Sequence, residues 1–364
     1  MTRSDQIRPI RRWAAAATAL AASVAVSACG SSTTPTTSAS SSAAGGSSSS
    51  GVTASNAAAT KPAKIVSTGK GGITLRVGDQ AGTGAQALLT AAGLIDTLPF
   101  KVQWADFTSG PPMLQAMSAG DLDIGGVGDA PPVFAAAGGA KIAIVGALAN
   151  DPDSAALIVP KDSPIHSISQ LKGKKIAVAQ GSSADYHLLT VLNKAGLSVH
   201  DVTLDYLQPA EGLAALSSHA VDAWDIWSPF VEEAALQDGD RILVNGKGYG
   251  SNYSYEVASK SSIANPTSAK EITEYLKVLD QAHVWANTHA AGWAKTWAAA
   301  TGLPTTTMVK AAQDDQERPI AVSSSTVSAE QSLVDAFAKA GLIPSSYSFA
   351  PYTSTSFNSS LGGS

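Results

Sequence analysis

Residues 122–135 read LDIGGVGDAPPVFA, a short apolar run that ends in glycines and is followed by an aspartate, two prolines and more apolar residues. The first part, Leu122–Gly126, has the length and the bounding residues of a buried strand. Proline suits the first turn of a helix, because its missing N–H would have no partner there. The stretch therefore predicts a strand and a helix that starts at Pro131, which together form the repeating unit of an α/β fold.

Strands and helices alternate in the same way on both sides of this stretch. Apolar runs with strand character occur at Ile73–Val77, Lys101–Trp104, Lys141–Leu148, Ala155–Val159, Lys175–Ala179, Thr203–Leu207, Val221–Ile226, Arg241–Val244 and Tyr253–Ala258. Helical patterns begin between them at Ala85, Pro112, Asp185, Ala210 and Pro229. This alternation predicts an α/β architecture with mostly parallel sheets.

The pattern changes after Tyr253, because helical segments dominate the last third of the chain. The best candidates are Glu271–Asn287, Trp293–Ala299, Thr306–Ala312 and Ala329–Ala340. About 300 residues follow the N-terminal region, which is enough for two lobes with cores of their own. We expect lobe 1 to combine residues 71–154 with 254–364, and lobe 2 to be residues 155–253. The chain would cross twice, near Ala155 and Ser254, and two crossings form a hinge.

Residues 1–28 have the layout of a secretory signal. Four arginines precede an alanine-rich apolar run, Trp13–Val26, that ends in small residues. The run is shorter than the roughly 20 apolar residues that span a bilayer. The sequence Val26-Ser27-Ala28-Cys29 resembles a bacterial lipoprotein signal box, which implies cleavage before Cys29 and acylation of its sulfur. Because Cys29 is the only cysteine, no disulfide can form within the chain.

Residues 29–70 consist largely of serine, threonine, glycine and alanine, and such a segment buries too little apolar surface to fold. We interpret it as a flexible tether behind the lipidated cysteine. The protein is therefore expected to be exported and held by lipid on the outer face of the cytoplasmic membrane, on the periplasmic or cell-wall side. A net charge of −5 argues against nucleic acid as a partner and against a polybasic membrane contact.

Two enzyme classes are considered and not favoured. Gly82–Ala87 matches the dinucleotide-binding pattern G-x-G-x-x-A, and Asp106 follows about 20 residues later. Four residues separate Val77 from Gly82, however, whereas the fingerprint needs its first glycine at the strand end. The sequence contains no G-x-S-x-G, no H-E-x-x-H and no Cys–His spacing for a metal. We expect neither catalysis, nor a cofactor, nor a metal.

Four loops that lead from a strand into a helix share glycine, serine or proline at the helix start. They are Ser109–Pro112, Gly128–Pro131, Gly181–Ala184 and Trp227–Pro229. In open α/β sheets, ligands bind outside the carboxyl ends of the strands, where such loops lie. A helix start presents free N–H groups and about half a positive charge. Capping alone explains any one loop, but the four together predict a site for a small organic anion that needs no lysine or arginine.

Aromatic side chains and one carboxylate lie beside these loops. Phe107, Tyr186, Trp224 and Trp227 would either pack against an organic tail of the ligand or belong to the core. Asp225 lies within an apolar strand, where an unpaired carboxylate would be costly. It therefore either faces the cleft or pairs with a donor, and we expect the cleft.

A resemblance to the binding proteins of aliphatic sulfonate transporters is carried by Ser109–Pro112, Gly128–Pro132, Leu157–Pro164, Leu171–Ala177, Val221–Pro229 and residues 330–344. The resemblance covers roughly Leu75 to Leu342. It implies a two-lobed type II periplasmic-binding-protein fold that closes on an anion. It also implies a monomer that delivers its ligand to an ABC permease driven by a cytosolic ATPase.

The resemblance implies ligand contacts by position, and the loops add others. The implied contacts are Ser109, Gly110, Asp129, Ala130, Gly181, Ser182 and Trp224, with Gln80 as a further candidate. The residues added from the loops and their strand are Gly128, Ser183, Asp225 and Trp227.

The chain departs from the family pattern at one loop. Relatives often read Trp-Asp-Pro where this chain has Trp227-Ser228-Pro229, and they are commonly apolar where it has Asp225. An alkanesulfonate is the first ligand to expect. Taurine, nitrate, an aromatic sulfonate or carboxylate and a pyrimidine precursor are alternatives, and a nucleotide-dependent enzyme is a distant one.

Overall fold

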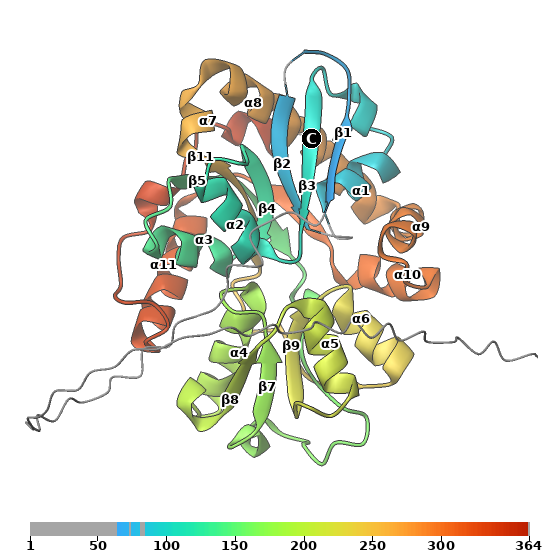
Figure 1. Ribbon diagram of the computed structural model, residues 1–364, viewed down its shortest axis with the longest axis vertical. Coiled ribbons are helices and arrows are strands. Elements are labelled where there is room, and N and C mark those ends of the chain that lie inside the picture. Colours follow the sequence, from blue (N-terminus) through green and yellow to red (C-terminus); the bar gives the residue numbers. More distant parts are fainter. Residues whose placement is uncertain (1–63, 73, 81–83, 363–364) are drawn as a thin grey trace, which may run out of the picture. The chain divides into compact units, whose positions relative to one another are not determined.

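Two β-sheets organise the computed structural model, which describes residues 64–72, 74–80 and 84–362 (Figure 1). The predicted signal, Cys29 and most of the predicted tether lie outside these residues. The first sheet has the strand order β1-β3-β2-β4-β11-β5-β12. Its strands are β1 (Lys64–Thr68), β2 (Thr74–Gln80), β3 (Lys101–Phe107), β4 (Ile124–Gly128), β5 (Ile142–Asn150), β11 (Tyr253–Ser259) and β12 (Glu317–Ile320).

The second sheet has the strand order β10-β6-β9-β7-β8. Its strands are β6 (Ala155–Val159), β7 (Lys175–Val178), β8 (Thr203–Tyr206), β9 (Ala223–Trp227) and β10 (Arg241–Asn245). The α/β class is confirmed, but the prediction of mostly parallel sheets is wrong. Only β3-β2-β4 and β9-β7-β8 pair in parallel, and all other described neighbours are antiparallel.

The reason for the mixed sheets lies in how the chain changes sheet. A parallel neighbour requires a long crossover connection, usually a helix. The links from β5 to β6 and from β10 to β11 are short instead, residues 151–154 and 246–252. The strand that follows each link therefore starts at the edge where the previous strand ended and runs away from it. Hydrogen bonds from Ser228 N to Ser154 O (2.8 Å) and from Asn150 N to Asn252 O (2.9 Å) hold both links in place.

The helices cover the sheets as the alternation predicts. Those near the first sheet are α1 (Ala85–Ala91), α2 (Gly110–Ser118), α3 (Ala130–Ala137), α7 (Lys260–Ala264), α8 (Pro266–Thr288), α9 (Ala290–Thr301), α10 (Thr305–Asp314) and α11 (Ser324–Lys339). Those of the second sheet are α4 (Ser183–Lys194), α5 (Pro209–Ser217) and α6 (Phe230–Glu233). The predicted helix starts lie within a few residues of these bounds, except that α8 and α11 begin about a turn earlier than expected.

Two apolar clusters enclose the first sheet. Leu75, Val77 and Trp104 pack with α1, α8 and α9 on one face, while α2, α3 and α11 lie on the other (Figure 1). The second cluster continues into the other sheet, because Phe337 of α11 contacts Phe134 of α3, with ring centroids 4.7 Å apart, and Tyr186 of α4 at 5.7 Å. The two sheets thus share part of one core.

The two strands that the sequence prediction missed lie at the edges of the first sheet. The predicted tether, residues 29–70, extends too far, because Lys64–Thr68 pairs antiparallel with β3. The Trp104 indole N–H also donates to Thr68 Oγ1 at 2.7 Å. β12 contains Pro319, which sequence patterns place outside central strands. Both strands are short and gain their partners only in the folded chain.

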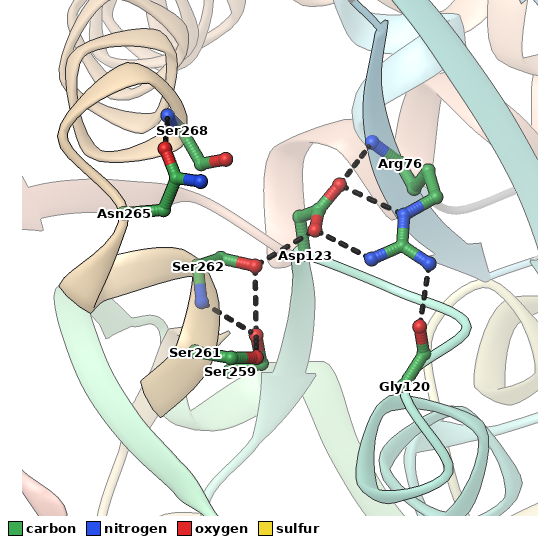
Figure 2. A network of polar contacts seen from close by, with 8 residues as sticks. All are labelled: Arg76, Gly120, Asp123, Ser259, Ser261, Ser262, Asn265 and Ser268. Atoms are coloured by element: carbon green, nitrogen blue, oxygen red, sulfur yellow. Dashed lines mark hydrogen bonds and ion pairs between the residues drawn. The ribbon is translucent and has the colours of Figure 1, made fainter.

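Asp123 connects three elements of the first sheet and its surroundings (Figure 2). Its Oδ2 accepts from Arg76 N (2.8 Å) and Nε (3.1 Å), and its Oδ1 accepts from Arg76 Nη2 and from Ser262 Oγ, both at 2.7 Å. Burial alone would raise the pKa of Asp123, but the hydrogen bonds from Arg76 and Ser262 outweigh it and hold the pKa below its usual value. The carboxylate therefore joins β2 and the start of β4 to α7 in its charged form.

We expect Asp123→Asn to lower the free energy of unfolding by about 1–3 kcal/mol at neutral pH, because the side chain keeps its shape but loses its charge-assisted hydrogen bonds. Urea denaturation measures the difference. The difference should shrink as the pH falls through the lowered pKa of Asp123, since the parent protein then loses the same charge. Asp121→Asn, at an exposed neighbour, is the control and should change stability by less than about 0.5 kcal/mol. Equal losses in both variants would contradict the role given to this network.

Candidate functional site

A cavity of about 210 Å³ lies where strands of both sheets end. Gln80 ends β2, Gly128 ends β4, Asn150 ends β5 and Trp227 ends β9, and all four line it. The starts of α2 and α4 also reach the cavity, through Gly110, Ser182 and Ser183. All four predicted loops therefore contribute to one site, as expected for the carboxyl ends of strands in an α/β fold.

Seven of the twelve residues predicted to bind ligand line this cavity. They are Gln80, Gly110, Gly128, Asp129, Ser182, Ser183 and Trp227. Asp129 is only 4% exposed, and Ser251 Oγ donates to its Oδ2. Burial raises the pKa of Asp129, although the hydrogen bonds from Ser251 and Ser183 oppose that shift. The structure brings these residues together, and ligand binding by them stays a prediction.

Three other predicted residues face away from the cavity. Ser109 is fully buried, and its Oγ donates to Gln208 Oε1 at 2.9 Å. Ala130 is fully buried in the apolar core. Gly181 adopts φ +71°, and a side chain there would meet the ring of Phe134 at 3.2 Å. These residues shape the loops and do not line the cavity.

The prediction for Trp224 and Asp225 needs correction. Trp224 is fully buried in the core of the second sheet, where a Cβ on Gly212 would lie 2.5 Å from its Nε1. Asp225 is also fully buried, and both of its carboxylate oxygens lie 2.9 Å from His187 Nδ1. Asp225 pairs with a donor on α4 and does not face the cleft. Asp225 also does not replace the aspartate that relatives often carry at the position of Ser228. The Oγ of Ser228 itself donates to Glu232 Oε1 at 3.0 Å.

His187 lines the cavity, although the sequence prediction did not select it. Its Nε2 lies 3.2 Å from Asn245 O, so both ring nitrogens face acceptors. Burial alone would lower the pKa of His187, but the charge and hydrogen bond of Asp225 outweigh burial and raise it. Burial also raises the pKa of Asp225, and the charge and hydrogen bond of His187 oppose that shift.

The helix starts differ in the donors that they offer. Pro111 and Pro112 in α2, and Pro131 and Pro132 in α3, have no N–H. α4 begins with Ser183 and Ala184, whose N–H groups have no partner within the helix. The prolines that marked the loops in the sequence thus remove donors from them. α4 is the helix whose start is best suited to an anion.

A second group of lining residues was missed by the sequence prediction. It includes three carboxyl groups, Asp79, Glu256 and Glu317, with His283 and the rings of Trp293 and Trp297. The two indole rings are stacked, with centroids 4.9 Å apart. No lysine or arginine is among the cavity-lining residues that the structure describes. Glu256 could have been singled out, because it is an acid in an otherwise apolar strand, the same signal that drew attention to Asp225.

Burial raises the pKa of two of these carboxyl groups, Asp79 and Glu256. It raises the pKa of Asp79 to about 7, although the backbone N–H of Gln86 hydrogen-bonds to that carboxylate at 3.1 Å. It raises the pKa of Glu256 to about 8, helped by the charges of Glu317 and Asp79. Glu256 is 5% exposed, and its Oε2 has no hydrogen-bond partner among the described residues.

The contacts of Asp79 argue against the dinucleotide-binding alternative. Its carboxylate accepts from Gln86 N at the start of α1, and a Cβ on Gly84 would lie 1.4 Å from its Oδ1. A pyrophosphate would need those same N–H groups. The fingerprint's first glycine, Gly82, lies outside the described residues, but the helix start that follows it is already occupied by the protein's own carboxylate.

The described residues contain neither a cluster of metal ligands nor a helix that could span a membrane. Residues 64–72, 74–80 and 84–362 contain no group of three or more His, Cys, Asp or Glu side chains placed to hold a metal ion. Within the same ranges, none of the helices combines the length and the apolar character needed to cross a bilayer.

Known proteins resemble this chain across the region that builds the site. The family model described as NMT1/THI5-like matches residues 108–290, half of the chain. A putative aliphatic sulfonates-binding protein of Escherichia coli strain K12 is 38% identical over 188 residues, which cover 51% of this chain and 59% of that relative. The chain thus matches less than two thirds of that relative's length.

Solved structures extend the likeness to the whole fold. The alkanesulfonate-binding protein SsuA of Xanthomonas axonopodis pv. citri, bound to MOPS, superposes with a TM-score of 0.74 at 32% identity, covering 78% of this chain and 99% of that one. The desulfurization enzyme DSZB has a TM-score of 0.55 at 17% identity, covering 79% and 98%, which shows the fold alone. The resemblance to binding proteins of sulfonate transporters and the periplasmic-binding-protein fold are confirmed.

We expect Glu256→Gln to stabilise the empty protein at alkaline pH. The native state holds the Glu256 proton more tightly than the unfolded chain, so the parent loses stability as the pH rises from about 4.5 to about 8. The glutamine variant lacks this loss. Relative to the parent, it should gain at least about 1 kcal/mol between about pH 5 and about pH 8.5, measured by urea denaturation. A difference that stays constant with pH would contradict the raised pKa of Glu256.

Proposed function

We propose, on the premise that the chain belongs to the NMT1/THI5-like family, that it is the extracytoplasmic solute-binding component of an ABC importer. Its ligand would be a small organic anion, with an aliphatic sulfonate as the first choice. One observation carries this proposal: the start of α4 opens into a cavity that residues of both sheets line. The sulfonate-binding relatives in Escherichia coli and Xanthomonas support the ligand class.

The anion would bind at the start of α4. The N–H groups of Ser183 and Ala184 are free within the helix, and the hydroxyl of Ser183 lies beside Gly128, close to the position that a Cβ would take. The imidazole of His187 lies one turn further along α4 and also lines the cavity. Several charge-assisted hydrogen bonds of this kind would supply the roughly −8 kcal/mol of a micromolar complex.

Capture would proceed by closure of two lobes. Lobe 1 would comprise residues 64–154 and 254–364, which adds β1 to the predicted range, and lobe 2 would comprise residues 155–253. Hydrogen bonds already join the two proposed lobes. Gln208, which precedes α5 in lobe 2, accepts through its Oε1 from Thr108 Oγ1 (2.8 Å) and Ser109 Oγ (2.9 Å) in lobe 1. The links at residues 151–154 and 246–252 would act as the hinge.

The proposal assigns no reaction to the site. Both nitrogens of His187, the histidine beside the α4 start, are engaged by Asp225 and Asn245, so this histidine is not free to act as the base for a nucleophile. The mature protein would be a monomer, exported and tethered through a lipid on Cys29. It would hand its ligand to a permease that a cytosolic ATPase drives.

A thermal-shift screen of the exported protein tests the ligand class, because a ligand that binds only the folded state raises the melting temperature. The compounds are alkanesulfonates of increasing length, taurine, nitrate, sulfate, aromatic sulfonates and carboxylates, and a pyrimidine precursor. We expect the alkanesulfonates to raise the melting temperature. Sulfate should raise it less, because sulfate has no alkyl tail to pack against Trp293 and Trp297, which line the cavity. Stabilisation by none of the sulfonates would refute the proposal.

Gln208→Ala tests closure. The substitution removes the acceptor that joins Thr108 and Ser109 to the second sheet, so the closed form becomes less favourable. We expect the Kd for an alkanesulfonate to rise about three- to tenfold, as measured by calorimetry. Gln115→Ala, on the exposed face of α2, is the matched control and should leave the Kd unchanged. An unchanged Kd in Gln208→Ala would remove this contact from the mechanism.

A further inference from the structure

Glu256 is a buried acid with an incomplete set of partners. β11 pairs antiparallel with β4 and places Glu256 opposite Gly126, and the carboxyl group takes the space beside that glycine, with Oε1 2.8 Å from where a Cβ would be. The residue lines the cavity, is 5% exposed, and has no hydrogen-bond partner for Oε2 among the described residues. A buried carboxylate is costly unless hydrogen bonds or a cation compensate its charge.

The groups around Glu256 do not supply that compensation. Its titratable neighbours on other elements are Asp79 of β2, Tyr275, Asp280 and His283 of α8, and Glu317 of β12. His283 Nδ1 lies 3.4 Å from Glu317 Oε2, but burial lowers the pKa of His283 despite the nearby carboxylates. No lysine or arginine among the described residues lines the cavity. Among the described groups, Glu256 therefore has acids as neighbours and no cation at neutral pH.

Glu256 also lies near the helix start that we assign to the sulfonate. Gly126 and Gly128 are alternate residues of β4, which are about 7 Å apart and face the same side of the strand. The Glu256 carboxyl group takes the space beside the first glycine, and the hydroxyl of Ser183 in α4 takes the space beside the second. An anion at the start of α4 would thus lie on the order of 7 Å from Glu256. Two like charges at such a distance repel each other strongly away from bulk water.

The protonation state of Glu256 decides how strongly an anion is repelled. Burial and the charges of Glu317 and Asp79 raise the pKa of Glu256 to about 8, so most molecules of the empty protein hold the neutral acid at pH 7. A bound anion adds like charge and raises that pKa further. Asp79 differs, because Gln80 N and Gln86 N each donate to its carboxylate at 3.1 Å and stabilise the charged form.

We propose that the protein binds its organic anion together with a proton, and that the carboxyl group of Glu256 holds this proton. The inference rests on the proposed function and adds a second ligand to the same cavity. Where Glu256 is ionised in the empty protein, a carboxylate oxygen accepts a proton from the solvent as the anion binds. The anion and the proton enter as a neutral pair, and no other covalent bond forms or breaks.

Proton uptake makes the Kd of the anion depend on pH in one direction. Below about pH 7, Glu256 is already protonated in the empty protein, so the Kd should stay constant. Above that pH the complex holds more protons than the empty protein, and linkage makes the affinity fall as the pH rises. We expect the Kd for butanesulfonate to rise about five- to tenfold between about pH 7 and about pH 9.

Calorimetry on the full exported protein counts the proton directly. Butanesulfonate is titrated at about pH 8.5 in borate and in Tris, because these buffers release protons with different enthalpies, and the difference in binding enthalpy gives the number taken up. Sulfonate buffers are avoided, because the structure of the Xanthomonas relative contains MOPS. We expect an uptake of at least about half a proton at about pH 8.5 and close to none at about pH 5.5.

Glu256→Gln mimics the protonated side chain, since the amide is neutral and has nearly the same shape. At about pH 8.5 this variant should bind butanesulfonate within about threefold of the parent's Kd at about pH 5.5, and it should lose at least about half of the proton uptake. A merely structural role for Glu256 would not give this match between a variant at high pH and the parent at low pH.

Glu271→Gln is the matched control. Glu271 is likewise 5% exposed, its Oε1 is unpartnered among the described residues, and burial raises its pKa too, but it does not line the cavity. This variant should keep both the proton uptake and the pH dependence of the parent.

The outcomes separate this inference from the proposed function. If no alkanesulfonate binds at any pH, the proposed function fails and the inference fails with it. If butanesulfonate binds without proton uptake at about pH 8.5, or if Glu256→Gln keeps the full uptake, the function stands and the inference is overturned. If the variant does not fold, the parent decides: a Kd that starts to rise above about pH 7 supports Glu256, and one that starts to rise below it contradicts Glu256.

Discussion

The short links between the two sheets constrain the rest of the structure. A chain that passes directly from one sheet to the other must start its new strand at the shared edge, so β6 and β11 run away from the cavity, while β2, β4, β5 and β9 end there. Helices that follow strands at this edge begin at the cavity and direct their N–H groups toward it. The antiparallel strands and the binding site thus have one cause.

The same constraint explains why acids and a helix start share one cavity. β11 enters the first sheet between β4 and β5, and this position brings Glu256 beside the glycines of β4. The space beside Gly126 is taken by the Glu256 carboxylate and the space beside Gly128 by the Ser183 hydroxyl. The helix start proposed to hold the anion, that of α4, belongs to the second sheet, whereas Asp79 and Glu256 belong to the first.

The buried polar groups differ in how they are satisfied, and the difference indicates their roles. Asp123 has donors for both oxygens and supports the sheet. Asp225 and His187 satisfy each other at the edge of the cavity. Glu256 keeps an unpartnered oxygen among the described residues, as Glu271 and Glu330 also do. Glu256 differs from these two because it lines the cavity.

The α/β class, the order of most elements and the loops that build the cavity follow from the sequence, because apolar periodicity and helix-start residues act over a few neighbouring positions. The sheet directions, the partner of Asp225 and the acidic lining of the cavity depend on contacts in the folded chain. Asp225 and Glu256 are both acids in apolar strands, and local sequence cannot distinguish them. His187 is 38 residues from Asp225 and satisfies it, while nothing comparable reaches Glu256 Oε2 among the described residues. Which strand faces a covering helix and which faces a cavity depends on contacts between distant segments, and those form only when the chain folds.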